Sequence, residues 1–164
     1  MIAYLKKILS GQFEASLAML EECVDKCPAD HWNGKIAKYE FWHVAYHTLC
    51  CTDMYLSPSW EEFQPSEFHP LGMDELTNEF PSREFSRDEI STYLTHCRKK
   101  ATATLAEETI DSLERPAEFH WLPSLSRGEL HIYSIRHVMH HTGQLSAYLR
   151  RLDIDTDWVK SGWH

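Results

Sequence analysis

The chain has 164 residues, a length that suits a single domain over residues 1–164 with a sizeable core. Its 16 basic and 25 acidic side chains give a net charge of −9, which argues against nucleic acid or an anionic membrane as a partner. The sequence holds no run of ~18 apolar residues, and its first residues lack the basic-then-apolar pattern of a signal peptide. The five cysteines lie within helical patterns, so we expect reduced thiols and a cytoplasmic protein.

The first half of the chain shows two helical patterns. The first runs from about residue 1 to residue 26, with apolar residues at helical spacing, and Pro28 ends it. The second runs from about Lys35 to Leu56 and is apolar nearly all round. A helix of that kind belongs in a bundle core or at a subunit interface.

The second half adds two more helices. A proline-rich and aromatic-rich connection over residues 59–85 predicts a long ordered loop that covers something. Capping boxes begin the next two helices, at Ser86–Glu89 and at Ser126–Glu129. The third helix is expected to end before Arg115 and the fourth at about Leu152. We therefore predict an all-α four-helix bundle with a long loop between helices two and three.

Two histidine pairs stand out on these helices. His137 and His141 are four residues apart on the last helix, and so are His43 and His47 on the second. Side chains at this spacing share one helix face, so both members of a pair can reach one metal ion. His47 is the better third ligand beside His137 and His141, and His43 is the alternative. A histidine on an apolar face can also be a packed core residue, and that interpretation stands beside metal binding.

The chain resembles the DinB or YfiT-like superfamily of metal-dependent four-helix bundles. The features that carry the resemblance are the apolar second helix with His47 and a downstream acid, Asp53, and the His-x-x-x-His-x-Gly-Gln pattern from His137 to Gln144. The opening from Gln12 to Trp32 is also similar, so the likeness covers most of the chain. The chain departs from the pattern at Thr142, where relatives often carry Arg, and at His43, an additional histidine.

The resemblance implies an up-down-down-up bundle, one divalent metal held by His47, His137 and His141, and a homodimer. Relatives with assigned activities use low-molecular-weight thiols, as S-transferases or isomerases. The leading hypothesis is a metal-dependent enzyme, either a thiol-dependent S-transferase or a hydrolase acting on a small molecule. Gln144, Tyr46 and Asp53 are candidates for orienting ligands or substrate, and no catalytic residue is assigned.

Two other functions compete with this hypothesis. One is a non-catalytic stress-response or dimerisation module with a structural or adventitious metal site. The other is a ferritin-like di-iron bundle, which requires Glu-x-x-His on two helices, and only Glu40–His43 fits that pattern. Imidazole ligands accept several metals, so zinc and nickel are expected first, with iron and manganese behind them.

Overall fold

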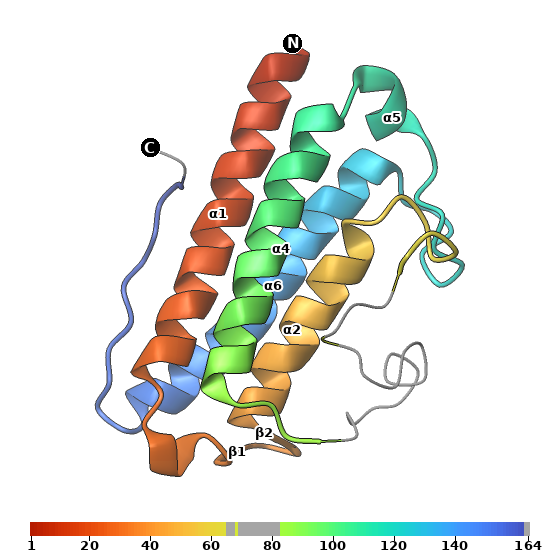
Figure 1. The fold of residues 1–164 in the computed structure, drawn as a ribbon. Coiled ribbons are helices and arrows are strands. Elements are labelled where there is room, and N and C mark those ends of the chain that lie inside the picture. The colour runs from red at the N-terminus through yellow and green to blue at the C-terminus, as the bar shows by residue number, and fades with distance from the viewer. Residues whose placement is uncertain (65–67, 69–82, 163–164) are drawn as a thin grey trace.

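The computed structural model describes residues 1–64, 68 and 83–162. Most of the predicted long connection after the second helix lies outside these residues. The elements in chain order are α1 (Ile2–Lys26), η1 (Ala29–His31), β1 (Lys35–Ile36), β2 (Tyr39–Glu40), α2 (Phe41–Tyr55), α4 (Arg87–Glu107), α5 (Ile110–Glu114) and α6 (Arg127–Arg150) (Figure 1).

The four long helices α1, α2, α4 and α6 pack side by side as a bundle, which confirms the predicted fold class (Figure 1). In Figure 1, α1 and α6 run in one direction, and α2 and α4 run in the other. The main packing contacts join α1 to α4 and α6, and α2 to the same two helices. The histidines of α2 and α6 therefore come from neighbouring, antiparallel helices.

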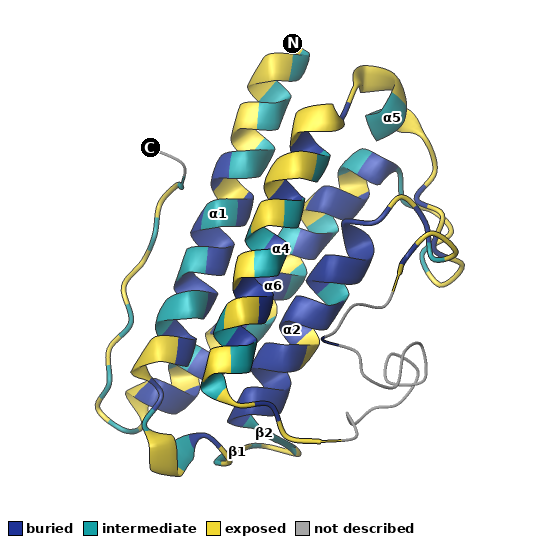
Figure 2. Ribbon diagram, viewed as in Figure 1, coloured by how far each residue is buried: buried dark blue, intermediate teal, exposed yellow. Residues whose placement is uncertain are grey.

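Apolar side chains at helical spacing build the core between the helices. Figure 2 shows the buried faces of α1, α4 and α6 turned inward, whereas α2 is buried over nearly its whole length. Thirteen of the 15 residues of α2 are buried, and the two that are not are His47 and Cys51. Since these two residues are four apart, α2 presents a single open stripe.

The observed helix ends partly match the predicted ones. Both capping boxes are present, with Glu89 bonded to Ser86 and Glu129 bonded to Ser126. The second helix begins at Phe41 and not near Lys35, because residues 35–40 form a small antiparallel hairpin. Ala37 in this hairpin has a φ of 55°, a left-handed conformation that an α-helix cannot contain.

The third predicted helix is divided into α4 and α5. Glu108 leaves the helical conformation with a ψ of 142°, and Thr109 then caps α5 through the backbone of Ser112. The carboxylate of Glu108 turns toward α6, where Arg127 and His131 bond it. This buried contact replaces the helical continuation that the local pattern favours.

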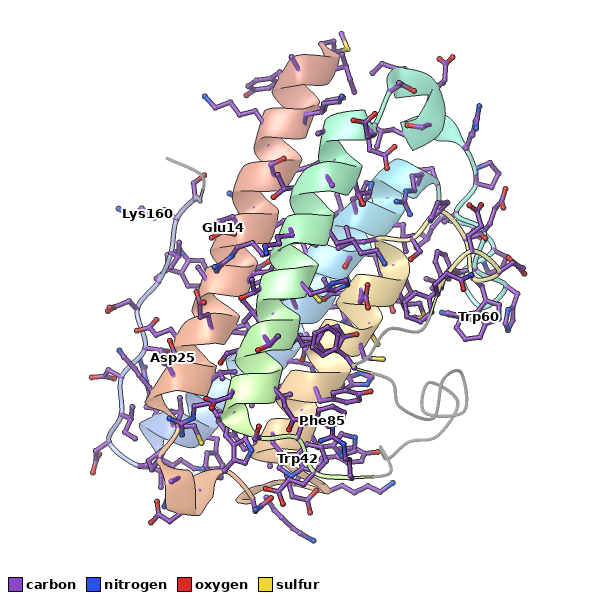
Figure 3. The ribbon with its side chains drawn as sticks, in the orientation of Figure 1. Glu14, Asp25, Trp42, Trp60, Phe85 and Lys160 are labelled. Carbon is purple, nitrogen blue, oxygen red and sulfur yellow. The ribbon has the colours of Figure 1, made fainter. Side chains whose placement is uncertain are left out.

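The C-terminal residues return along α1, and Figure 3 labels Lys160 in this segment. The Gly162 amide donates to the Gly11 carbonyl at 3.0 Å, and Gln12 donates to the Lys160 carbonyl at 3.3 Å. None of the described helices is both long enough and apolar enough to cross a membrane.

Candidate metal centre

The open stripe of α2 places one imidazole at the surface of the bundle. His47 is exposed, although burial of its ring by the surrounding helices lowers its pKa to about 4. Its neighbour on the stripe is Cys51, whose sulfur lies 3.8 Å from Nε2 of His47. Every other side chain of α2 is buried, so this stripe is where the helix can meet a ligand.

The last helix supplies two imidazoles to the same place. His137 and His141 are half-buried on α6, and their Nε2 atoms are 3.2 Å apart. The ring of His47 lies 5.3 Å from that of His137 and 4.9 Å from that of His141, measured between centroids. One nitrogen from each residue can be chosen so that all three lie within 4.8 Å of one another. We call these three residues the histidine triad.

The triad fits a divalent metal ion. Two imidazole nitrogens that each lie about 2.0–2.1 Å from one ion are separated by roughly 2.9–3.4 Å at octahedral or tetrahedral angles. The Nε2 atoms of His137 and His141 are 3.2 Å apart and already meet this requirement. The chosen nitrogen of His47 lies within 4.8 Å of those of His137 and His141. Imidazole ligands of this kind suit zinc, nickel, copper and iron.

The protonation state of the triad also fits metal binding. Burial and, to a smaller extent, the neighbouring imidazoles of His141 and His47 together lower the pKa of His137 to about 3. The pKa of His141 is lowered as well, mainly by burial. All three rings are therefore neutral at pH 7, which is the form that donates a lone pair to a metal.

Gln144 orients one ring of the triad. Its Oε1 lies 2.9 Å from Nδ1 of His141, so the imidazole donates its proton there and its Nε2 lone pair points toward His137. The amide nitrogen of Gln144 lies 3.4 Å from Nε2 of the exposed His140. This contact assigns the Gln144 oxygen to His141 and the nitrogen to His140.

The other residues singled out from the sequence lie elsewhere. His43 is 5 % exposed and stacks on Trp42, with ring centroids 5.4 Å apart, so it is not part of the triad. Tyr46 donates its hydroxyl to the Phe68 carbonyl. Asp53 is 1 % exposed and faces α4, where Lys100 bonds it at 2.6 Å. A step of about 100° per residue turns positions 46 and 53 away from the stripe of His47.

A cavity of about 610 Å³ opens at the far end of α2, away from the triad. Arg127 and Lys100 line it, but their cationic groups are already engaged by the protein. Arg127 donates to Glu108 at 3.0 Å and to the carbonyls of Tyr55, Leu56 and Ser57. The guanidinium therefore caps the C-terminus of α2, a structural role that satisfies helix-end carbonyls.

Comparison with known proteins places the chain in a family. The family model of the DinB superfamily matches residues 12–145, which is most of the sequence. The chain belongs to the DinB superfamily. The crystal structure of a DinB-like protein, YjoA from Bacillus subtilis, superposes with a TM-score of 0.63 at 17 % identity, covering 89 % of this chain and 92 % of that one. No curated protein matches the sequence.

These matches confirm the recognised superfamily and the DinB-like helical fold. The solved relative is too distant in sequence to carry more than the fold. The evidence for a metal centre in this DinB-superfamily chain is therefore the geometry of the triad, in which His47, His137 and His141 lie close together between α2 and α6. Their role as metal ligands stays a prediction.

Sequence reasoning missed the residues that flank the triad. Cys51 and Tyr55 follow His47 at intervals of four on α2, and Tyr133 precedes His137 by four on α6. The same i,i+4 spacing that drew attention to the histidines would have found them. What the spacing alone does not show is that the two series face each other.

Proposed function

We propose that this chain is a divalent-metal-dependent enzyme that transfers a thiol to a small electrophilic substrate or hydrolyses such a substrate. The observation that carries the proposal is that His47, on the open stripe of the otherwise buried helix α2, lies beside two imidazoles of α6. All three imidazoles are neutral at pH 7. His47, His137 and His141 would hold the ion. No carboxylate joins the histidine cluster in the described part of the chain, which argues against a di-iron carboxylate centre.

The exposure of His47 favours a catalytic site over a structural one. Structural zinc sites are closed by four protein ligands, whereas catalytic sites have three and keep a position open. A bound ion would act as a Lewis acid and lower the pKa of a thiol or water that joins the three imidazoles.

The protein's own groups would prepare the site for this chemistry. Gln144 fixes the ring of His141, and the low pKa values of His47 and His137 keep their lone pairs available at pH 7. In thiol transfer, the incoming thiol would release its proton to solvent, its sulfur would form a bond to the electrophilic carbon, and the bond from that carbon to the leaving group would break, with the leaving group keeping the bonding electrons. Burial raises the pKa of the Cys51 thiol to about 12, and the thiol proposed to react is that of the cosubstrate.

The metal, the cosubstrate and the assembly belong to the same proposal. Zinc and nickel suit three imidazoles best, with iron and manganese as weaker candidates. A low-molecular-weight thiol is the proposed cosubstrate, and a homodimer is the proposed assembly.

Elemental analysis of untagged protein, purified without chelators, tests the metal centre. We expect about one divalent ion per chain, lost in His47→Ala and in His141→Ala. His120→Ala is the matched control, because His120 is exposed and lies outside the triad, so this variant should retain the ion. Wild-type protein that holds no metal after reconstitution with zinc or nickel would refute the proposal.

The enzymatic part has its own test. Metal-loaded protein should accelerate the reaction of a low-molecular-weight thiol with an electrophile such as chlorodinitrobenzene, or the hydrolysis of an ester, and chelation should abolish either rate. A loaded protein without either rate would support the non-catalytic module in place of the enzyme.

A further inference from the structure

The triad is one end of a longer strip shared by two helices. On α2 the strip continues from His47 to Cys51 and Tyr55, and on α6 it continues from His141 and His137 to Tyr133. The two helices lie side by side and run in opposite directions (Figure 1), and the ring contacts of His47 with His137 and of Tyr55 with Tyr133 show that the two series face each other. The ring of Tyr55 lies 5.5 Å from that of Tyr133 and 6.4 Å from that of His137. The strip therefore has the imidazoles of the triad at one end and the phenol rings of Tyr55 and Tyr133 at the other.

Loop residues extend this aromatic end beyond the helices. The indole nitrogen of Trp121 lies 3.4 Å from the Tyr55 hydroxyl, and the rings of Trp121 and Trp60 meet edge to face at 5.1 Å. Trp60, labelled in Figure 3, lies at the edge of the bundle and is tied through its amide to the Glu118 carbonyl. Beneath them, Phe119 is buried against Tyr55 with ring centroids 5.5 Å apart. Trp121 is thus fixed from below while 38 % of it remains exposed.

The two sides of the triad differ in chemistry. Toward the N-terminus of α2, the triad is followed by the Gln144 amide and the imidazole of His140. Toward the C-terminus of α2, the neighbours are a thiol, two phenols and an indole, none of which carries a charge at neutral pH. A rigid, uncharged and partly exposed aromatic surface beside a set of metal donors favours a planar apolar group over a charged one.

We propose that the substrate of this site carries an aromatic or similarly planar apolar group that packs against Trp121 and Tyr133 while its reactive group meets the triad. The inference rests on the proposed metal centre and names the substrate class of that same site. Trp121 and Tyr133 then determine specificity, and neither residue is needed to hold the metal.

Two zinc-binding probes that differ in one ring test the inference. Acetohydroxamate and benzohydroxamate carry the same chelating group, but only benzohydroxamate adds a phenyl ring. Their affinities for the zinc-loaded full chain are measured by calorimetry in the wild type, in Trp121→Ala and in Trp158→Ala. Trp158 is the matched control, because it is 72 % exposed on the C-terminal segment. Tyr133→Leu provides a second variant that retains an apolar side chain if Trp121→Ala folds poorly.

We expect Trp121→Ala and Tyr133→Leu each to reduce the preference for benzohydroxamate over acetohydroxamate by about five- to tenfold. Zinc content, acetohydroxamate affinity and the behaviour of Trp158→Ala should be unchanged. Zinc-loaded variants with the wild-type preference would overturn this inference and leave the metal centre intact. A wild-type chain that binds no zinc would instead refute the metal centre, and this inference with it.

Discussion

The hydrogen bond between Gln144 and His141 makes the sharpest prediction about the triad. Gln144→Ala removes the acceptor that lies 2.9 Å from Nδ1 of His141. The ring would then lose the partner that holds its Nε2 lone pair toward the metal position. Loss of such an outer partner typically weakens metal binding by about 10- to 100-fold, which corresponds to roughly 1.4–2.7 kcal/mol.

The surroundings of Gln144 favour the lower part of this range of affinity loss. The side chain is half-buried, so in the variant water can replace part of the lost bond. We therefore expect zinc affinity to fall by about 10- to 30-fold. The assay is competition with a chromophoric chelator at pH 7. Gln144→Glu restores an acceptor and should recover the wild-type affinity, because a carboxylate accepts the same proton.

A matched amide serves as the control. The side chain of Gln12 makes a hydrogen bond remote from the triad, in which it donates to the Lys160 carbonyl. Gln12→Ala should leave zinc affinity unchanged. If Gln144→Ala binds zinc within twofold of the wild type, the contact with His141 does not orient the ring, and the assignment of the amide in this site is wrong.

Three further predictions concern pH and buried charge. The pKa is about 4 for His47 and about 3 for His137, so both rings stay neutral well below the pH at which an ordinary histidine takes up a proton. Zinc affinity should therefore fall by less than about tenfold between pH 7.5 and pH 5.5. Chelator competition at the two pH values measures this, and a roughly thousandfold fall, as expected for three imidazoles of ordinary pKa, would contradict it. Arg127→Met leaves the buried carboxylate of Glu108 without its cationic partner. The free energy of unfolding, measured by urea titration, should fall by about 3–5 kcal/mol, and adding Glu108→Gln to this variant should restore part of the loss. Lys100→Met should lower the free energy of unfolding by about 2 kcal/mol, because the buried Asp53 carboxylate loses a partner at 2.6 Å. Lys99 is exposed, so Lys99→Met should leave the free energy of unfolding unchanged in the same titration.

The sequence alone predicted the four long helices and singled out the three histidines that lie together in the triad. Helical periodicity and the two capping boxes are local signals, so they place helices without knowledge of their neighbours. The i,i+4 spacing of His137 and His141 is equally local. In the structure His47 lies beside His137 and His141 while His43 is buried against Trp42, and the role of His47 as a ligand stays a prediction.

Tertiary structure decided what the local patterns leave open. The helix expected to end just before Arg115 ends at Glu107, since the Glu108 carboxylate bonds Arg127 and His131, which lie about 20 residues further along the chain. Helical periodicity turns Asp53 away from His47, but only the packing of α4 on that face supplies Lys100 as its partner. The aromatic strip formed by Tyr55, Tyr133 and Trp121 joins three separate segments. Spacing along one helix shows which side chains share a face, but only the packing of two helices and a loop determines what that face meets.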